Sequence, residues 1–76
     1  MKYLKVIERE GVTPIKWKCN GFIIEKYFIS NINMYTYGVS SPKDDETCFC
    51  YVRSLKEARG FCVTNKVEEM ERLWLN

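Results

Sequence analysis

The sequence predicts an α+β fold, in which an antiparallel sheet of three to four strands precedes a C-terminal helical segment. Three observations predict it. Large side chains alternate between two faces over much of the chain, an Asn-Gly dipeptide joins two alternating segments, and a capping box opens a segment with helical spacing. A chain of 76 residues that is 46% hydrophobic can fold alone but cannot form two cores, so we expect a single domain over residues 1–76.

Residues 13–19 have the clearest strand pattern. Trp17 and Cys19 fall on one face, whereas Lys16 and Lys18 fall on the other. This period of two is typical of a strand with one buried face. Residues 2–7 alternate only weakly and are compatible with either a short strand or a helical turn.

The Asn20-Gly21 dipeptide suits the positive φ angles of a type I′ turn and predicts a hairpin between residues 13–19 and 22–30. Residues 22–30 carry large apolar groups on both faces, which indicates a central strand or one whose second face is covered. Two further strands are expected over residues 34–40 and 47–52. The polar stretch between them, residues 40–46, predicts a solvated loop.

A capping box at Ser54 and Glu57 predicts the start of a helix. Beyond it lie two apolar stripes, rotated by roughly 140° from each other at helical spacing, and one straight helix cannot bury both against one sheet. The first stripe is Leu55, Ala58, Phe61 and Cys62, and the second is Val67, Met70 and Trp74. We therefore expect a bend within residues 60–65 and two helices near residues 55–63 and 66–75, with Asn65 as a second cap.

The composition argues against an enzyme. The chain has no histidine, and its four glycines are too dispersed to form a phosphate-binding loop. The net charge of +2 is too small to predict a nucleic-acid partner from the overall field. The N-terminal segment is charged and no apolar run is long enough to span a bilayer, so we expect a cytoplasmic protein with no membrane partner.

Four cysteines could form two disulfides, but without a secretory signal we expect reduced thiols that pack as small apolar groups. A zinc-stabilised fold is the alternative, although Cys48 and Cys50 are separated by a single residue, which is too short for the usual zinc-ligand pair. The acidic run at residues 44–46 is interpreted as a solvated turn rather than a cation site. No cofactor is expected.

Two surfaces are candidates for binding. The out-of-phase second stripe must pack elsewhere, self-associate or meet a partner, which makes it the predicted partner-binding surface. This surface consists of the stripe residues Val67, Met70 and Trp74 together with the adjacent Leu75. The alternative is a nucleic-acid surface of basic and aromatic strand residues. Its members are Lys16, Lys18, Lys26, Arg53, Tyr35 and Tyr37.

Residues 51–59, Tyr-Val-Arg-Ser-Leu-Lys-Glu-Ala-Arg, resemble the strand-to-helix junction of small phage and prophage accessory proteins and of arm-type DNA-binding domains of tyrosine integrases. The second resemblance implies a sheet face inserted into the major groove of DNA. Glu25 and the scarcity of outward Arg and Lys depart from that pattern. The first implies a stand-alone protein that binds a host protein, as inhibitors of host defence such as anti-CRISPR proteins do.

The sequence thus predicts a small non-catalytic protein-binding module, phage-encoded and inhibitory, that acts on a host protein such as a CRISPR-type defence effector in the host cell cytoplasm. A nucleic-acid-binding module that uses the sheet face is the alternative function. Self-association is left open.

Overall fold

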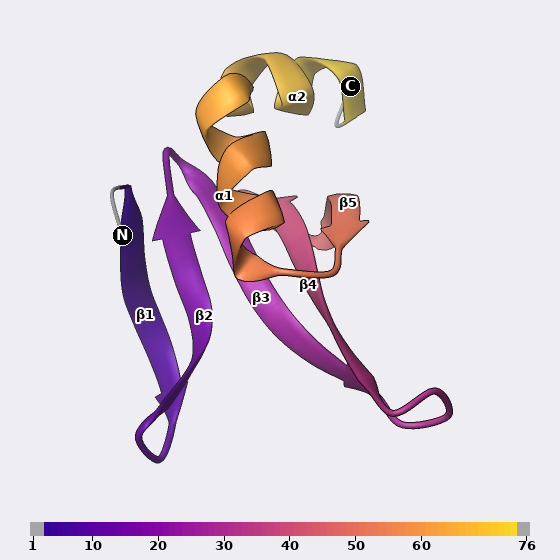
Figure 1. Cartoon of the computed structure of the whole chain (residues 1–76). Coiled ribbons are helices and arrows are strands. Elements are labelled where there is room, and N and C mark those ends of the chain that lie inside the picture. The colour runs from indigo at the N-terminus through magenta and orange to yellow at the C-terminus, as the bar shows by residue number, and fades with distance from the viewer. Residues whose placement is uncertain (1–2, 75–76) are drawn as a thin grey trace.

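The computed structural model describes residues 3–74, with the side chain of Asp45 excepted, and contains a five-stranded antiparallel sheet followed by two helices (Figure 1). The strands lie side by side in chain order, as β1 (Leu4–Glu10), β2 (Thr13–Cys19), β3 (Phe22–Ile29), β4 (Met34–Ser41) and β5 (Asp44–Val52). Helix α1 (Leu55–Thr64) lies on one face of the sheet, and α2 (Val67–Trp74) lies at one end of it. The fold is α+β, as predicted.

The prediction of three to four strands was wrong, because the N-terminal segment is a full strand. Strand β1 pairs with β2 from Leu4, opposite Cys19, to Glu10, opposite Thr13. Its pairing shifts register between Val6 and Glu8 and again between Glu8 and Arg9. A register shift interrupts the alternation of faces, so a sequence pattern with a strict period of two is weak in this strand.

The predicted loop over residues 40–46 was also wrong. Strand β4 continues through Ser41 and β5 begins at Asp44, which leaves a two-residue turn. The Asp44 carboxylate accepts hydrogen bonds from the Glu46 N–H at 3.1 Å and from the Thr47 hydroxyl at 2.8 Å. Ser and Asp side chains that bond to nearby groups are typical of loops, but here they serve a tight turn and the start of a strand.

The hairpin prediction is confirmed. Asn20 and Gly21 have φ angles of 51° and 88°, and Cys19 pairs directly with Phe22 across the two-residue turn. The Asn20 side-chain amide also donates a 2.8 Å hydrogen bond to the Cys62 carbonyl. This bond ties the turn to α1, so the hairpin and the helix are fixed against each other.

The hydrophobic core lies between the sheet and α1. Its buried members are Trp17, Cys19, Phe22, Ile24, Val39, Phe49, Ala58 and Cys62. Phe22 contacts Phe49 and Phe61 edge-on, with ring centroids 5.9 and 5.6 Å apart. Phe49 joins this cluster because the β4–β5 register passes from Cys48 to Cys50 and leaves it as the extra residue of a bulge.

The cap at Ser54 and the division into two helices are confirmed, and the break between the helices lies at residues 65–66, at the C-terminal end of the predicted range. The Glu57 N–H donates to the Ser54 hydroxyl at 3.1 Å, and the Glu57 carboxylate accepts from the Arg53 N–H at 3.0 Å. Asn65 was expected to cap the start of the second helix, and that prediction was wrong. Asn65 is the C-cap residue of α1 and donates from its side-chain amide to the Phe61 carbonyl, whereas the Lys66 carbonyl accepts from the Met70 N–H at the start of α2. The chain then turns into α2, so the two apolar stripes lie on two helices.

A carboxylate of α2 fastens this helix to the β4–β5 turn. Glu71 accepts a hydrogen bond from the buried Ser41 hydroxyl and lies 3.7 Å from the Lys43 ammonium. Within residues 3–74, no helix is long and apolar enough to cross a membrane.

Candidate functional site

The helices cover only part of the sheet. Strands β3 and β4 extend beyond α1 as a hairpin whose tip lies far from both helices (Figure 1). Along the helix-facing side of β3, Phe22 and Ile24 are fully buried, whereas Phe28 is 52% exposed. The change within one strand marks where the helical cover stops.

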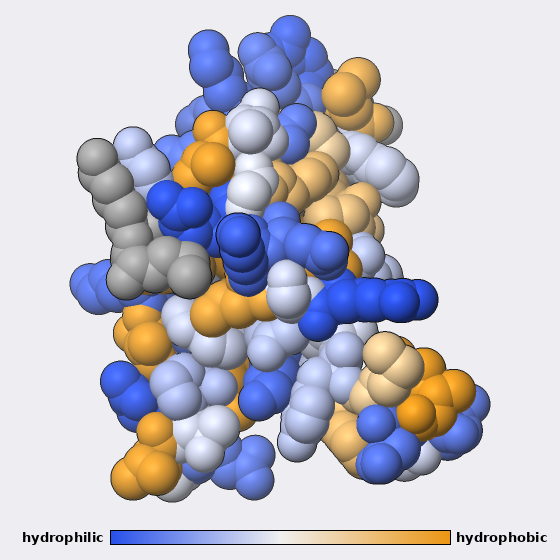
Figure 2. All heavy atoms as spheres, viewed as in Figure 1, coloured by the Kyte–Doolittle hydropathy of each residue, from blue (hydrophilic) through white to orange (hydrophobic). Residues whose placement is uncertain are grey.

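The uncovered part of this hairpin is rich in large apolar side chains, and we call it the hairpin end. It consists of Tyr27, Phe28, Ile29, Ile32, Met34 and Tyr35. All except Ile29 are among the exposed large hydrophobic residues, with exposed fractions from 39% to 57%. Figure 2 shows apolar atoms gathered on this projection. Exposed apolar side chains that adjoin one another mark interaction surfaces more often than singly scattered ones do.

Strand pairing arranges these side chains on both faces of the hairpin. Phe28 lies opposite Tyr35, with ring centroids 5.1 Å apart, and Ile29 lies opposite Met34. Asn33 has a φ angle of 53° and donates from its N–H to the Ser30 carbonyl, which closes the turn. The polar turn residues thus present an apolar residue, Ile32, at the tip.

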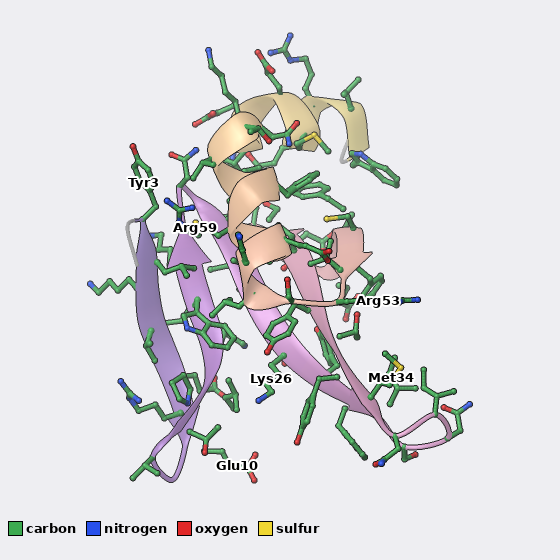
Figure 3. All side chains as sticks on the ribbon, in the orientation of Figure 1. Tyr3, Glu10, Lys26, Met34, Arg53 and Arg59 are labelled. Carbon is green, nitrogen blue, oxygen red and sulfur yellow. The ribbon has the colours of Figure 1, made fainter. Side chains whose placement is uncertain are left out.

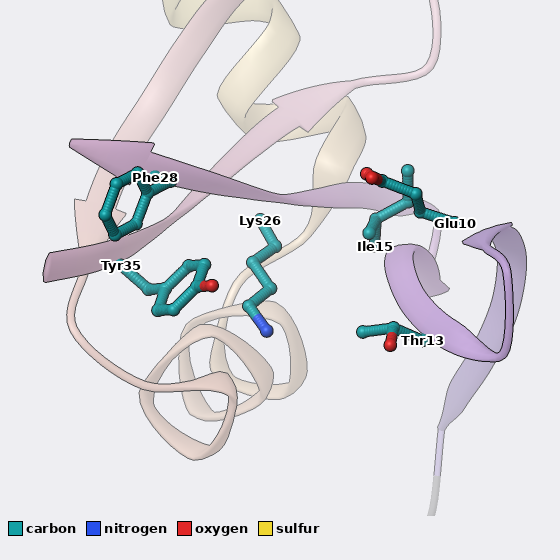
Figure 4. Close-up of a pocket in the computed structure, with 6 residues that line it drawn as sticks. All are labelled: Glu10, Thr13, Ile15, Lys26, Phe28 and Tyr35. Atoms are coloured by element: carbon teal, nitrogen blue, oxygen red, sulfur yellow. The ribbon is translucent and has the colours of Figure 1, made fainter. Parts of the chain in front are cut away.

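A hollow of about 460 Å³ lies beside the hairpin end on the helix-facing side (Figure 4). It is lined by Glu10, Thr13, Ile15, Lys26, Phe28 and Tyr35. The Lys26 ammonium lies 4.2 Å from the centroid of the Tyr35 ring. The hollow therefore separates the aromatic pair of one hairpin from the end of the β1–β2 hairpin, with a lysine between them.

Neither α1 nor α2 covers the opposite face of the sheet, and aromatic residues of that face gather over a glycine. A Cβ at Gly38 would lie 3.0 Å from the Tyr27 ring, 3.1 Å from the Cys48 sulfur and 3.3 Å from the Tyr51 ring. A second hollow, of about 440 Å³, is lined by Tyr27, Ile29, Thr36 and Tyr51. Partial burial, followed by the neighbouring Glu25 carboxylate, raises the pKa of Tyr27 to about 12.

The predicted partner-binding stripe on α2 lies mostly against the protein's own core. Val67 and Met70 are half-buried and pack against the core cluster. Trp74 lies beside Phe49, with ring centroids 6.3 Å apart, and is 55% exposed. Leu75 lies outside the described residues. The stripe has an intramolecular role, and its part in an interface stays a prediction.

The structure distributes the predicted nucleic-acid residues over two faces of the sheet. Lys16 and Lys18 lie opposite Glu25 and Ile23 on the face without helices, and Lys16 is 3.7 Å from both Glu8 and Glu25. The other strand members lie on the helix-facing side, where Lys26 is paired in register with Tyr37. Tyr37 packs against Trp17 at 5.9 Å.

Figure 3 shows Lys26 below α1, on the side of Glu10, whereas Arg53 points away from both. Of the predicted nucleic-acid residues, Lys26, Tyr35 and Tyr37 share the helix-facing side, and Lys26 and Tyr35 line one hollow. Lys16, Lys18 and Arg53 do not line this hollow.

All four cysteines are free thiols in the structure. Burial raises the pKa values of Cys19, Cys50 and Cys62. The Cys48 thiol donates to the Cys50 carbonyl at 3.0 Å. In residues 3–74, apart from the Asp45 side chain, no three metal-ligating side chains gather in one place. A raised pKa leaves less of the reactive thiolate near neutral pH, so packing accounts for these cysteines.

No family model matches the chain, and no match was found among curated proteins or solved structures. The resemblance to phage proteins therefore stays a hypothesis based on residues 51–59.

The hairpin end was not predicted from the sequence, because no local pattern indicated where the helical cover of the sheet stops. One signal was present, namely the large apolar groups on both faces of residues 22–30. That pattern indicates a central strand or a covered second face, but a strand that extends beyond the helix covering it gives the same pattern.

Proposed function

We propose that this protein is a non-catalytic protein-binding module and that the hairpin end is its contact surface. The observation that supports the proposal is the set of five large exposed apolar side chains on a projection that the helices do not cover. Apolar area exposed to water carries a free-energy cost that a binding partner removes.

The composition of this surface favours a protein over a nucleic acid. Within residues 26–35, Lys26 is the only lysine or arginine. Nucleic-acid affinity comes largely from several cations that contact phosphates, whereas protein interfaces are rich in Tyr, Phe and Met around a desolvated centre. A host defence protein as the partner is a narrower hypothesis, and it rests on the sequence resemblance alone.

The test compares two charge insertions at exposed apolar positions. The double variant Ile32→Asp/Met34→Asp changes the hairpin end, and Val12→Asp changes the 88% exposed tip residue between β1 and β2. Each variant and the wild type are immobilised, exposed to nuclease-treated bacterial lysate, and the captured proteins are quantified by mass spectrometry.

We expect the wild type and Val12→Asp to capture the same protein, and the double variant to lose it. Equal capture by the double variant would place the binding surface elsewhere. Capture of no protein from the nuclease-treated lysate, together with direct binding of the wild type to nucleic acid, would support the alternative function instead.

A further inference from the structure

Lys26 occupies an unusual position for a lysine. It belongs to the row of β3 side chains that faces the helices, between the buried Ile24 and the aromatic Phe28, and it is itself half-buried. No ion pair involves Lys26 in the part of the chain that the structure describes. Lys16 provides the contrast, because two carboxylates lie 3.7 Å from its ammonium.

The surroundings of the Lys26 ammonium satisfy its charge only partly. The Tyr35 ring lies 4.2 Å from it, and such a cation–π contact at a partly exposed site stabilises the charge only modestly. Glu10 lines the same hollow from the far wall, yet the two charges form no ion pair in the described structure. A partly desolvated ammonium gains from an added anion more than a fully hydrated one does.

We propose that this hollow receives the carboxylate of an Asp or Glu side chain from a protein segment that lies across the hairpin end. The inference rests on the proposed function and names the chemistry of the partner at one position. Lys26 pairs with the carboxylate, and Ile15 and Phe28 contact its aliphatic stem. The apolar neighbours of the acidic residue cover Tyr35 on the same face of the hairpin and Ile32 at its tip.

Charge complementarity favours a carboxylate over a phosphate. The hollow contains one cation, Lys26, and one anion, Glu10. Lys26 and Glu10 form no ion pair in the described part of the chain, so one incoming carboxylate can pair with the Lys26 ammonium. A phosphate group brings up to two charges and finds no second cation among the lining residues. Nucleic acid is therefore an outcome that the test must be able to reveal.

The experiment uses a random peptide display library selected against the immobilised full-length protein. We expect the wild type to select peptides with an acidic residue beside large apolar residues. Lys26→Met, which keeps the length and apolar contacts of the side chain, should still select peptides but without the acidic preference. Lys18→Met, on the opposite face, should select as the wild type does.

A selected peptide then supplies a matched pair, with the acidic residue kept or replaced by its amide. We expect the amide to bind the wild type about tenfold more weakly, as for a good charge-assisted pair, and to bind Lys26→Met as the acid does. Thermal melting of each variant confirms that it is folded.

The outcomes separate the two proposals. Peptides with no acidic preference would overturn this inference and leave the proposed function intact. Failure to select any peptide, or selection that survives Ile32→Asp/Met34→Asp unchanged, would overturn the proposed function and the inference with it. If no acidic peptides are selected but a fluorescent oligothymidylate binds in a Lys26-dependent way, the hollow binds a phosphate group and the carboxylate proposal is wrong.

Discussion

The two halves of strand β3 share one backbone and one alternation of faces, but they have different surroundings. In the first half, Phe22 and Ile24 are fully buried beneath α1. In the second half, Phe28 on the same face is 52% exposed, and Tyr27 on the other face is also exposed. The amount of apolar side chain is similar, so the difference comes from where the helical cover stops.

This contrast separates stability from binding. The covered half carries the packing contacts that stabilise the fold. For a chain of 76 residues, the expected free energy of unfolding is about 4–11 kcal/mol. The uncovered half contributes less, and its side chains are free to be buried by a partner. Substitutions that act differently on the two halves test this division, and they follow from the largest expected effect to the smallest.

Phe22→Ala should destabilise the protein by about 3–5 kcal/mol, because the ring is fully buried and contacts two other phenylalanines. Phe28→Ala should cost about 1 kcal/mol or less, because half of that ring already contacts water. Urea unfolding measures both free energies. Similar losses of unfolding free energy for the two variants would contradict the division of β3 into a covered and an uncovered half.

Gly21→Ala should cost about 2 kcal/mol. Gly21 has a φ angle of 88°, and a Cβ there would lie 2.9 Å from a methyl carbon of Val67 on α2. Gly11→Ala is the matched control, since Gly11 has a φ angle of 62° but open space around it, and its cost should be about 1 kcal/mol. If the two costs agree, α2 does not pack on this turn.

Ser54→Ala should lower the free energy of unfolding by about 1 kcal/mol, because the variant loses the acceptor for the Glu57 N–H at the start of α1. Ser30→Ala, at the turn of the uncovered hairpin, is a suitable comparison because its side chain is exposed. A melting temperature unchanged by Ser54→Ala would show that the cap contributes nothing to the helical cover.

The smallest effect concerns pH. The folded protein raises the pKa of Tyr27 to about 12 from an ordinary value of 10.0. Between these values the unfolded chain loses this proton first, so the contribution of Tyr27 to stability is present below pH 10 and is lost as pH rises towards 12. In an ultraviolet titration, Tyr27→Phe should remove a late-ionising tyrosine. Loss of an early-ionising one would contradict this assignment.

The sequence predicted those parts of the fold that are determined by local chemistry. Asn20-Gly21 and Ser54 each specify a backbone conformation through their own side chains, so the turn and the cap were located correctly. Strand β1 was harder, because its register shift breaks the alternation. The end of β4 and the start of β5 were not predicted, because Ser41 and Asp44 are residue types typical of loops. Their side chains accept hydrogen bonds from backbone N–H groups in and beside a tight turn.

The candidate site was less predictable, because it depends on the relative lengths of a helix and a strand. Nothing local to Phe28 or Tyr35 distinguishes an exposed aromatic residue from a buried one. The sequence did single out Lys26 and Tyr35 together, but for nucleic acid. Their neighbours in the hollow, Glu10 and Thr13, come from a different hairpin and could be found only from the tertiary structure.

The most direct test of the hairpin end as the binding surface is a nuclear magnetic resonance titration of the isotope-labelled protein with a selected peptide. The account predicts that backbone amide signals of residues 26–35 shift most and that those of α2 shift little. If the largest shifts occur in residues 67–74, the α2 stripe is the binding surface. Largest shifts at Lys16 and Lys18 would move it to the opposite face of the sheet, and either result would contradict the account.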